Sequence, residues 1–185
     1  MMSRIAITMK LALAILLVAP CLSNAADPLK PDLEKSKISF LGKKPDGEHK
    51  GGFKKFTIDA TADHEDPTKS SLKIEIDVES LWADDPKLDG PLKNPDFFDV
   101  KKYPKAVFES TKIEKVSDTE SKIHGKLTML GKTVEIVAPV KVDVTEEQIT
   151  ASTKFKIDRT KWGMEYGKGK INDEVEITSD LVFKP

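Results

Sequence analysis

Residues 71–80, SLKIEIDVES, alternate apolar and polar side chains without a break. The apolar residues Leu72, Ile74, Ile76 and Val78 occupy every second position, and acids and a lysine stand between them. Successive side chains of a β-strand point to opposite faces, so a period of two predicts a strand with one buried and one solvated face. This stretch decides the fold class because the same period recurs along most of the chain.

Seven further segments show the same alternation and complete a set of eight predicted strands. They are marked by Ile38 and Phe40; Phe56, Ile58 and Ala60; Ala106, Phe108 and Ser110; Ile123, Gly125, Leu127 and Met129; Val134, Ile136, Ala138, Val140 and Val142; residues 149–157; and residues 175–183. Outside the N-terminal region, no segment of ten or more residues has the period of a helix. The sequence therefore predicts an all-β, antiparallel domain.

Alternation alone does not distinguish a β-sandwich from a barrel. Eight even strands, each with a single apolar face, suit an up-and-down barrel because closure removes exposed strand edges. A barrel of this size holds either packed side chains or one slender ligand. Within it, Gly51 and Gly52 give the second strand a place to bend or bulge, and Pro139 predicts an edge-like or bulged point in a later strand.

The first 25 residues have the three parts of a secretory signal peptide. The basic residues Arg4 and Lys10 precede an apolar run that is too short to span a bilayer comfortably. Ser23 and Ala25 then supply the small side chains that precede a cleavage site. The sequence thus predicts that the protein is exported.

The predicted organisation is a signal peptide over residues 1–25, a linker over 26–35 and a single domain over 36–185. Cys21 is the only cysteine, and it falls in the signal peptide. The mature chain is therefore expected to lack disulfides, cysteine metal sites and cysteine nucleophiles. No later segment approaches the roughly 20 apolar residues of a spanning helix, so we expect no stable membrane insertion.

Composition and motifs argue against several classes of function. The 30 Lys and Arg residues nearly balance the 31 Asp and Glu residues, which is not the electrostatic pattern of a nucleic-acid-binding protein. The three histidines are scattered without metal-ligand spacing, and His49 falls in a loop after the first predicted strand. The chain contains no glycine-elbow serine and no phosphate loop. We expect no metal, no catalytic cofactor and no enzymatic activity.

The longest stretch without alternation, residues 81–105, joins the third and fourth predicted strands. Long loops in compact domains are usually functional or disordered. Two Asx-Pro dipeptides, beginning at Asp85 and Asn94, each place a capping side chain before a proline, as at the start of a helix. Gly90 offers a stop for the first turn, so this loop is predicted to be ordered.

Phe97 and Phe98 follow the second of these dipeptides. Neighbours in a one-turn helix point about 100° apart, so the two rings cannot bury against one surface. We predict a short helical lid with one ring over the mouth of the barrel and the other against its rim near Trp82. Asp96 and Asp99 are expected to hold the ends of this helix. The alternative is a helical plug that closes a packed core.

Five segments resemble, in order, those of the YceI-like family of exported polyisoprenoid-binding proteins. They are GGFKKFTIDA (51–60), NPDFFDVKKYPKAVFES (94–110), GKLTMLGKT (125–133), IDRTKWGM (157–164) and INDEVEI (171–177). The loop around DFFD is the most specific of the five. The resemblance runs from about Ser36 to Phe183, which is essentially the whole predicted domain.

The resemblance implies an eight-stranded, lipocalin-like barrel whose apolar bore holds a long isoprenoid chain, of quinone or polyprenol type, for transport, storage or stress protection. It also implies export across the inner membrane, with a periplasm as the expected location. The alternative is a non-enzymatic interaction or stress protein with a side-chain-filled barrel and no ligand. The sequence leaves a homodimer open.

Inward-facing apolar positions and aromatic residues near the strand ends supply the candidate ligand-binding residues, with ordinary core packing as the alternative for each. They are Phe40, Phe56, Ile74, Ile76, Phe97, Phe98, Phe108, Leu127, Met129, Ile136, Phe155, Trp162 and Ile177. Arg159 is expected to fix the lid by pairing with Asp96 or Asp99. Its alternatives are a pairing with Asp173 or Glu174 and a solvated position in a turn.

Overall fold

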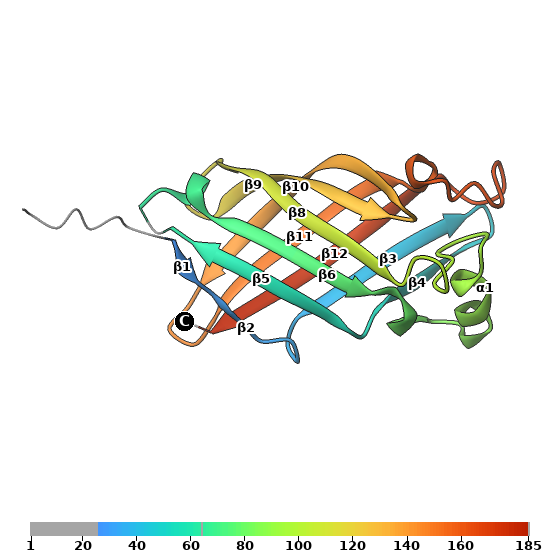
Figure 1. Ribbon diagram of the computed structural model, residues 1–185, viewed down its shortest axis with the longest axis horizontal. Coiled ribbons are helices and arrows are strands. Elements are labelled where there is room, and N and C mark those ends of the chain that lie inside the picture. The colour runs from blue at the N-terminus through green and yellow to red at the C-terminus, as the bar shows by residue number, and fades with distance from the viewer. Residues whose placement is uncertain (1–25, 64, 185) are drawn as a thin grey trace, which may run out of the picture.

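The computed structural model describes residues 26–63 and 65–184, and the predicted signal peptide lies outside the described residues. Within these ranges, twelve strands form a single sheet in the order β1-β5-β6-β8-β9-β10-β11-β12-β3-β4-β7, with β2 paired to β12. Figure 1 shows the sheet curled so that β5, β6 and β8 face β11, β12 and β3. All the ladders between strands are antiparallel, which confirms the predicted all-β, antiparallel class.

Nine long strands build the walls of the curled sheet. They are β3 (Lys37–Lys44), β4 (Gly47–Phe53), β5 (Phe56–Ala62), β6 (Ser71–Asp77), β8 (Lys105–Lys115), β9 (Glu120–Met129), β10 (Lys132–Val144), β11 (Ile149–Asp158) and β12 (Glu174–Lys184). The short strands are β1 (Asp27–Pro28), β2 (Lys30–Pro31) and β7 (Leu81–Ala83). The helical elements of the described residues are α1 (Asp89–Lys93) and the 3-10 turns η1 (Pro67–Lys69), η2 (Val78–Ser80), η3 (Pro86–Leu88) and η4 (Arg159–Trp162).

Each of the eight predicted runs lies in a long strand, except that Val78–Ser80, at the end of the run 71–80, form η2. The predicted count of eight is too low. The long strand that the pattern missed is β4, which contains His49, Gly51 and Gly52 and pairs with β3. It shows no apolar alternation because Gly51 lies against the ring of Phe40, where a Cβ atom would collide. His49 therefore belongs to a strand and not to a loop, and the two glycines lie in β4 instead of bending the second predicted strand.

Residues 26–35, predicted to be a linker, contribute to the sheet. β1 pairs with β5, and β2 pairs with the end of β12. Leu29, between the two short strands, packs against the buried core. The N-terminal segment thus connects β5 and β12, and residues 27–31 belong to the fold.

The strands β10 and β11 separate part of the way along their length. Their pairing covers Val140–Val144 and Ile149–Thr153, whereas β10 pairs with β9 along most of its length. The separation begins at Pro139, whose carbonyl accepts a hydrogen bond of 2.5 Å from the Thr153 hydroxyl. Proline suits this point because it has no N–H to donate to a neighbouring strand. The edge-like point predicted at Pro139 is confirmed.

The two ends of the curled sheet differ in how they are filled. One end carries β1, β2 and the C-terminus, and we call it the floor (Figure 1). There, inward-facing side chains pack into a buried cluster. Its members, each at most 9% exposed, are Ile38, Ile58, Ala60, Ile74, Leu181 and Phe183. At the opposite end, which we call the mouth, lie α1 and the loop that follows β11 (Figure 1).

Candidate functional site

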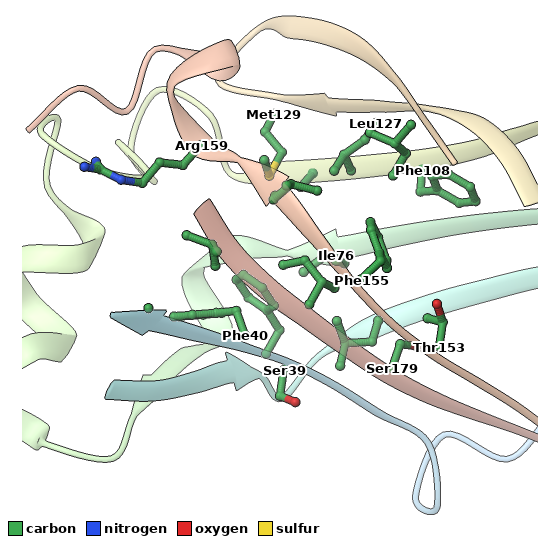
Figure 2. A pocket seen from close by; sticks show the side chains of 18 of the residues that line it. Ser39, Phe40, Ile76, Phe108, Leu127, Met129, Thr153, Phe155, Arg159 and Ser179 are labelled. Carbon is green, nitrogen blue, oxygen red and sulfur yellow. The ribbon is translucent and has the colours of Figure 1, made fainter. Parts of the chain in front are cut away.

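A cavity of about 390 Å³ occupies the interior of the curled sheet between the floor and the mouth. Inward-facing side chains of β3, β6 and β8 to β12, most of them apolar, form its walls. Figure 2 shows Phe108, Leu127 and Met129 on one side of this space and Phe40 on the other. The volume falls in the range of about 300–1,000 Å³ that is typical of small-molecule sites.

Most of the candidate ligand-binding residues line this cavity. They are Phe40, Ile74, Ile76, Phe97, Phe98, Phe108, Leu127, Met129, Ile136, Phe155 and Ile177. The alternation predicted all of them except Phe97 and Phe98, because every second residue of each wall strand points inward. The two phenylalanines were predicted from the loop that contains them. Met129 gives this wall a flexible, polarisable side chain that adapts to varied apolar surfaces.

Phe56 and Trp162 do not line the cavity, so the structure does not support their assignment to the site. Phe56, the first residue of β5, packs against the floor cluster. Trp162 is only 1% exposed, and its indole Nε1 donates a hydrogen bond of 3.0 Å to the carbonyl of Leu127. Trp162 thus anchors η4 to β9 behind the cavity wall.

The wall residues form cross-strand rows that border open space. Phe40, Ile177 and Phe155 are direct neighbours across β3, β12 and β11. Phe108 and Leu127 are neighbours across β8 and β9. All five are half-buried although they point inward, because their inner surfaces face the cavity and not another side chain.

Two glycines keep the middle of the cavity free of aromatic rings. A Cβ atom at Gly51 would collide with the ring of Phe40, and one at Gly125 would collide with the ring of Phe108. Each ring therefore lies close to the backbone of the neighbouring strand, in the space that a side chain would have taken. The rings cover the wall without filling the bore.

Sequence reasoning missed several lining residues. Phe53, Leu92 and Met164 line the cavity from β4, from α1 and from the loop after η4, where no alternation marks them. Ser179 and Thr153 are two of the polar lining residues that it passed over. Both occupy inward positions of correctly predicted strands, so the alternation could have found them.

The helical part of the mouth lies earlier in the chain than predicted. η3 and α1 cover residues 86–93, with Asp85 as the cap that accepts from the amide of Lys87. Asn94 ends α1 instead of starting a second helix. The following chain folds back, and the amide of Phe98 donates to the carbonyl of Leu92. The amide of Phe97 donates to the carbonyl of Asn94, so both phenylalanines lie in a turn after α1.

The two phenylalanines point to different partners, as the lid prediction required. The ring of Phe98 lies 6.1 Å from that of Phe40 and 5.7 Å from that of Phe53, between centroids. The ring of Phe97 lies 5.3 Å from that of Tyr166, in the loop after β11. Phe98 thus joins the wall, and Phe97 contacts the loop on the other side of the mouth. The predicted contact of a ring with the rim near Trp82 is replaced by these pairs.

Asp96 and Asp99 do not hold the ends of a helix, because the described structure has no helix between them. Asp96 is exposed, and Asp99 adopts a left-handed backbone with φ of 42°. The carbonyl of Asp99 accepts from the amides of Lys102 and Tyr103, which tightens the turn before β8. A different carboxylate, that of Asp89, ties α1 to β7 by accepting from the amide of Ala83 at 2.8 Å.

Arg159 is buried at the mouth, where it binds backbone carbonyls of the loop after β11, and it is not a solvated arginine. Its guanidinium is 4% exposed and donates to the carbonyls of Met164 (2.7 Å), Asn172 (3.1 Å) and Ile171 (3.3 Å). It also lies 3.5 Å from the Asp173 carboxylate. Of the predicted pairings, the one with Asp173 is therefore confirmed. Arg159 holds the two halves of the loop between β11 and β12 together beside the cavity.

Charged groups surround the mouth in pairs at the β3–β4 hairpin. Lys43 Nζ lies 3.5 Å from the carboxylate of Glu48, and His49 Nδ1 lies 3.2 Å from that of Asp84. The backbone amide of Lys50, which donates to Asp84, and His49 together hold the pKa of the Asp84 carboxyl below its usual value. The mouth is thus polar on its outer side and apolar where it meets the cavity.

Among residues 26–63 and 65–184, no three His, Cys, Asp or Glu side chains gather in a way that could hold a metal ion. In the same ranges, no helix has the length and hydropathy needed to cross a membrane.

The family model of the YceI-like domain matches residues 29–183. The chain belongs to the YceI-like family. Among solved structures, it resembles BcnA of Burkholderia cenocepacia, with a TM-score of 0.78 and 30% identity over 83% of this chain and 99% of that one. It also resembles the polyisoprenoid-binding domain from Saccharophagus degradans implicated in plant cell wall breakdown, with a TM-score of 0.68, 13% identity, and coverage of 86% and 98%. The latter likeness shows the fold alone.

Curated relatives of this YceI-like protein match over a shorter span. A UPF0312 protein of Pseudomonas putida is 36% identical over 83 residues, which are 45% of this chain and 43% of that protein. One of Vibrio cholerae is 32% identical over 88 residues, which are 48% and 47% of the two chains. The chain therefore spans about half the length of the curated relatives that it matches.

Proposed function

We propose that this protein binds a long, flexible apolar chain of the isoprenoid type within its cavity and acts as a carrier or store of that lipid. The observation that carries the proposal is the apolar cavity itself, whose walls combine half-buried aromatic and aliphatic residues. A barrel filled by its own side chains, the alternative, would leave no such space. The polyisoprenoid-binding domain with the same fold supports this choice of ligand class.

The energetics of such binding need few polar contacts. Burial of roughly 300 Å² of apolar ligand surface favours binding by about 7 kcal/mol, at roughly 25 cal/mol per Å². Ordering of the flexible chain and its loss of free motion offset part of this gain. Selectivity would then depend on the length and girth of the chain. A quinone or a polyprenol satisfies these requirements equally well.

The mouth supplies the means to retain the chain. Phe98 extends the aromatic wall at the opening, and the contact between Phe97 and Tyr166 joins the two mouth loops. Their separation would open a path into the cavity. We propose that these loops act as the lid and that the chemistry of the site is binding and not catalysis.

The direct test is analysis of what the protein carries. The native protein is purified without denaturation and its intact mass is measured, and an organic extract is then analysed for isoprenoids. We expect an added mass that matches an extracted lipid, and uptake of added quinone or polyprenol by the delipidated protein. An empty extract together with no uptake of either lipid would contradict the proposal.

We also propose that the protein works outside the inner membrane. The support is the signal-peptide pattern of residues 1–25. Cell fractionation tests this point independently of lipid binding: the processed chain should appear in the periplasmic fraction, and retention in the cytoplasm would contradict it.

A further inference from the structure

A buried hydroxyl in the cavity wall has no partner. Ser179 is 7% exposed, and its Oγ atom has no hydrogen-bond partner among the residues that the structure describes. It lines the cavity from β12, between the inward-facing residues Ile177 and Leu181. An unpaired buried hydroxyl destabilises a folded protein, because its hydrogen bonds to water are lost without replacement.

A second hydroxyl faces the same part of the cavity. Thr153 of β11 lies directly across from Ser179 in the ladder. Directly paired residues place their Cβ atoms about 4.5–5.5 Å apart. The Thr153 hydroxyl donates to the carbonyl of Pro139, so its oxygen retains only the capacity to accept. Figure 2 shows both side chains on the side of the pocket away from Arg159.

The surroundings of this pair are apolar. Its ladder neighbours are Ile38 on β3, beside Ser179, and Val140 on β10, beside Thr153. Both neighbours are buried and line the cavity. Ser179 stands five residues into β12, about 17 Å along the strand from its start at the mouth. A charged group would lose its hydration here without gaining a charged partner from these neighbours, so the position suits an uncharged oxygen.

We propose that Ser179 and Thr153 form an inner polar position that binds an uncharged oxygen, a hydroxyl or a carbonyl, of the lipid in the cavity. Ser179 donates to this oxygen, and a ligand hydroxyl can in turn donate to Thr153. The inference rests on the proposed function, since it names the ligand chemistry of the same cavity. The inner polar position selects chains that carry an oxygen at the end that enters first, in preference to pure hydrocarbons.

The test compares two probes on the delipidated protein: geranylgeraniol, and the hydrocarbon of the same chain without the hydroxyl. In Ser179→Ala, the preference for the alcohol over the hydrocarbon should fall by about three- to tenfold, the value of one neutral hydrogen bond. The affinity for the hydrocarbon should not fall. Ser179→Thr keeps a hydroxyl and should retain most of the preference.

The matched control is Ser152→Ala, one residue along β11. Ser152 donates to Asp180 at 2.7 Å, and it lies on the opposite face of the strand from Thr153. This variant should keep the preference of the wild type. The melting temperature of ligand-free Ser179→Ala should equal or exceed that of the wild type, because the variant loses an unpaired buried hydroxyl.

The possible results separate the inference from the proposed function. If both probes bind and Ser179→Ala leaves their affinity ratio unchanged, the inner polar position is wrong while lipid binding stands. If the affinity ratio is unchanged and Ser179→Ala melts at a lower temperature than the wild type, the Ser179 hydroxyl binds a buried water. That result also overturns the inference. If neither probe binds the wild type, the proposed function fails, and the inference fails with it.

Discussion

The floor and the mouth of this protein are built from the same strands but have opposite packing. At the floor, Phe183 of β12 is 3% exposed and lies within a closed cluster. Towards the mouth of the same strand, Ile177 and Val175 are half-buried and line the cavity. The alternation of apolar residues is identical in the two halves. Alternation therefore specifies the strand and its inward face, and what lies opposite decides whether that face is core or binding surface.

This difference predicts unequal costs for equal substitutions. The largest contrast involves two aromatic residues near the mouth, Trp162 and Tyr166. Trp162→Ala should lower the free energy of unfolding by about 3–5 kcal/mol, since a buried indole and its bond to Leu127 are lost. Tyr166→Ala should change it by less than about 0.5 kcal/mol, because the ring is 55% exposed. Urea unfolding of the ligand-free variants measures both, and equal losses would contradict the contrast.

The next contrast compares isoleucines of the floor and the cavity wall. Ile58→Ala should cost about 2–5 kcal/mol because it opens a void in a packed cluster. Ile177→Ala should cost much less, since this side chain already borders the cavity. The measurement is again urea unfolding without lipid. A wall that is as sensitive as the floor would mean that the cavity is filled in solution.

A smaller contrast separates the two phenylalanines of the mouth. Phe98→Ser should lower the stability of the ligand-free protein by about 1–3 kcal/mol, since its ring packs with Phe40 and Phe53. Phe97→Ser should leave stability nearly unchanged and speed ligand dissociation, because affinity changes of this kind appear mostly in the off-rate. Melting curves and a displacement assay test the pair. A large stability loss in Phe97→Ser with unchanged dissociation would make that ring structural and the lid proposal wrong.

The smallest effect concerns the cap of η4. Asp158 accepts from the hydroxyl and amide of Thr160, and these bonds lower the pKa of its carboxyl. Asp158→Ala should cost about 1 kcal/mol at neutral pH. The folded pKa lies below the usual 3.8, so this contribution is complete above that value and is lost as the pH falls through the folded pKa. Unfolding at pH 7 and pH 3 should show the gap between wild type and variant narrowing, and a constant gap would contradict the assignment.

Much of the architecture could be predicted from the sequence because alternation is a direct record of which face is buried. It failed at β4, where Gly51 replaces an apolar side chain so that the ring of Phe40 can lie over it. The helix at Phe97 and Phe98 was also predicted wrongly, because Asp85 and Asn94 carry the same Asx-Pro signal for the start of a helix. Only Asp85 begins a helical segment. After Asn94, the amides of Phe98 and Val100 donate hydrogen bonds back to carbonyls of α1.

The candidate site shows the same division. Wall residues such as Phe40 and Phe155 were predictable, since their positions follow the strand period. The pairing of Arg159 with Asp173 was also predicted. The other contacts of Arg159 and the role of Trp162 were not, because those partners are backbone carbonyls brought near by loops and turns. A backbone carbonyl has no signature in the sequence. Residues that bind such carbonyls can be assigned only from the fold.

The most direct test of the binding cavity is to fill it. Ile76 is half-buried and lines the bore, so Ile76→Trp should block a chain while the protein stays folded. Val137→Trp, at a side chain that is 48% exposed on β10, is the matched control. The melting temperature of each delipidated protein is measured with and without polyprenol.

At about one hundred times Kd, the lipid should raise the melting temperature of the wild type and of Val137→Trp by about 5–10 °C, and that of Ile76→Trp by nearly nothing. The account would be contradicted if the wild type showed no rise. It would also be contradicted if Ile76→Trp showed the same rise, or if that variant lost the roughly 1–3 kcal/mol expected from overpacking a solid core.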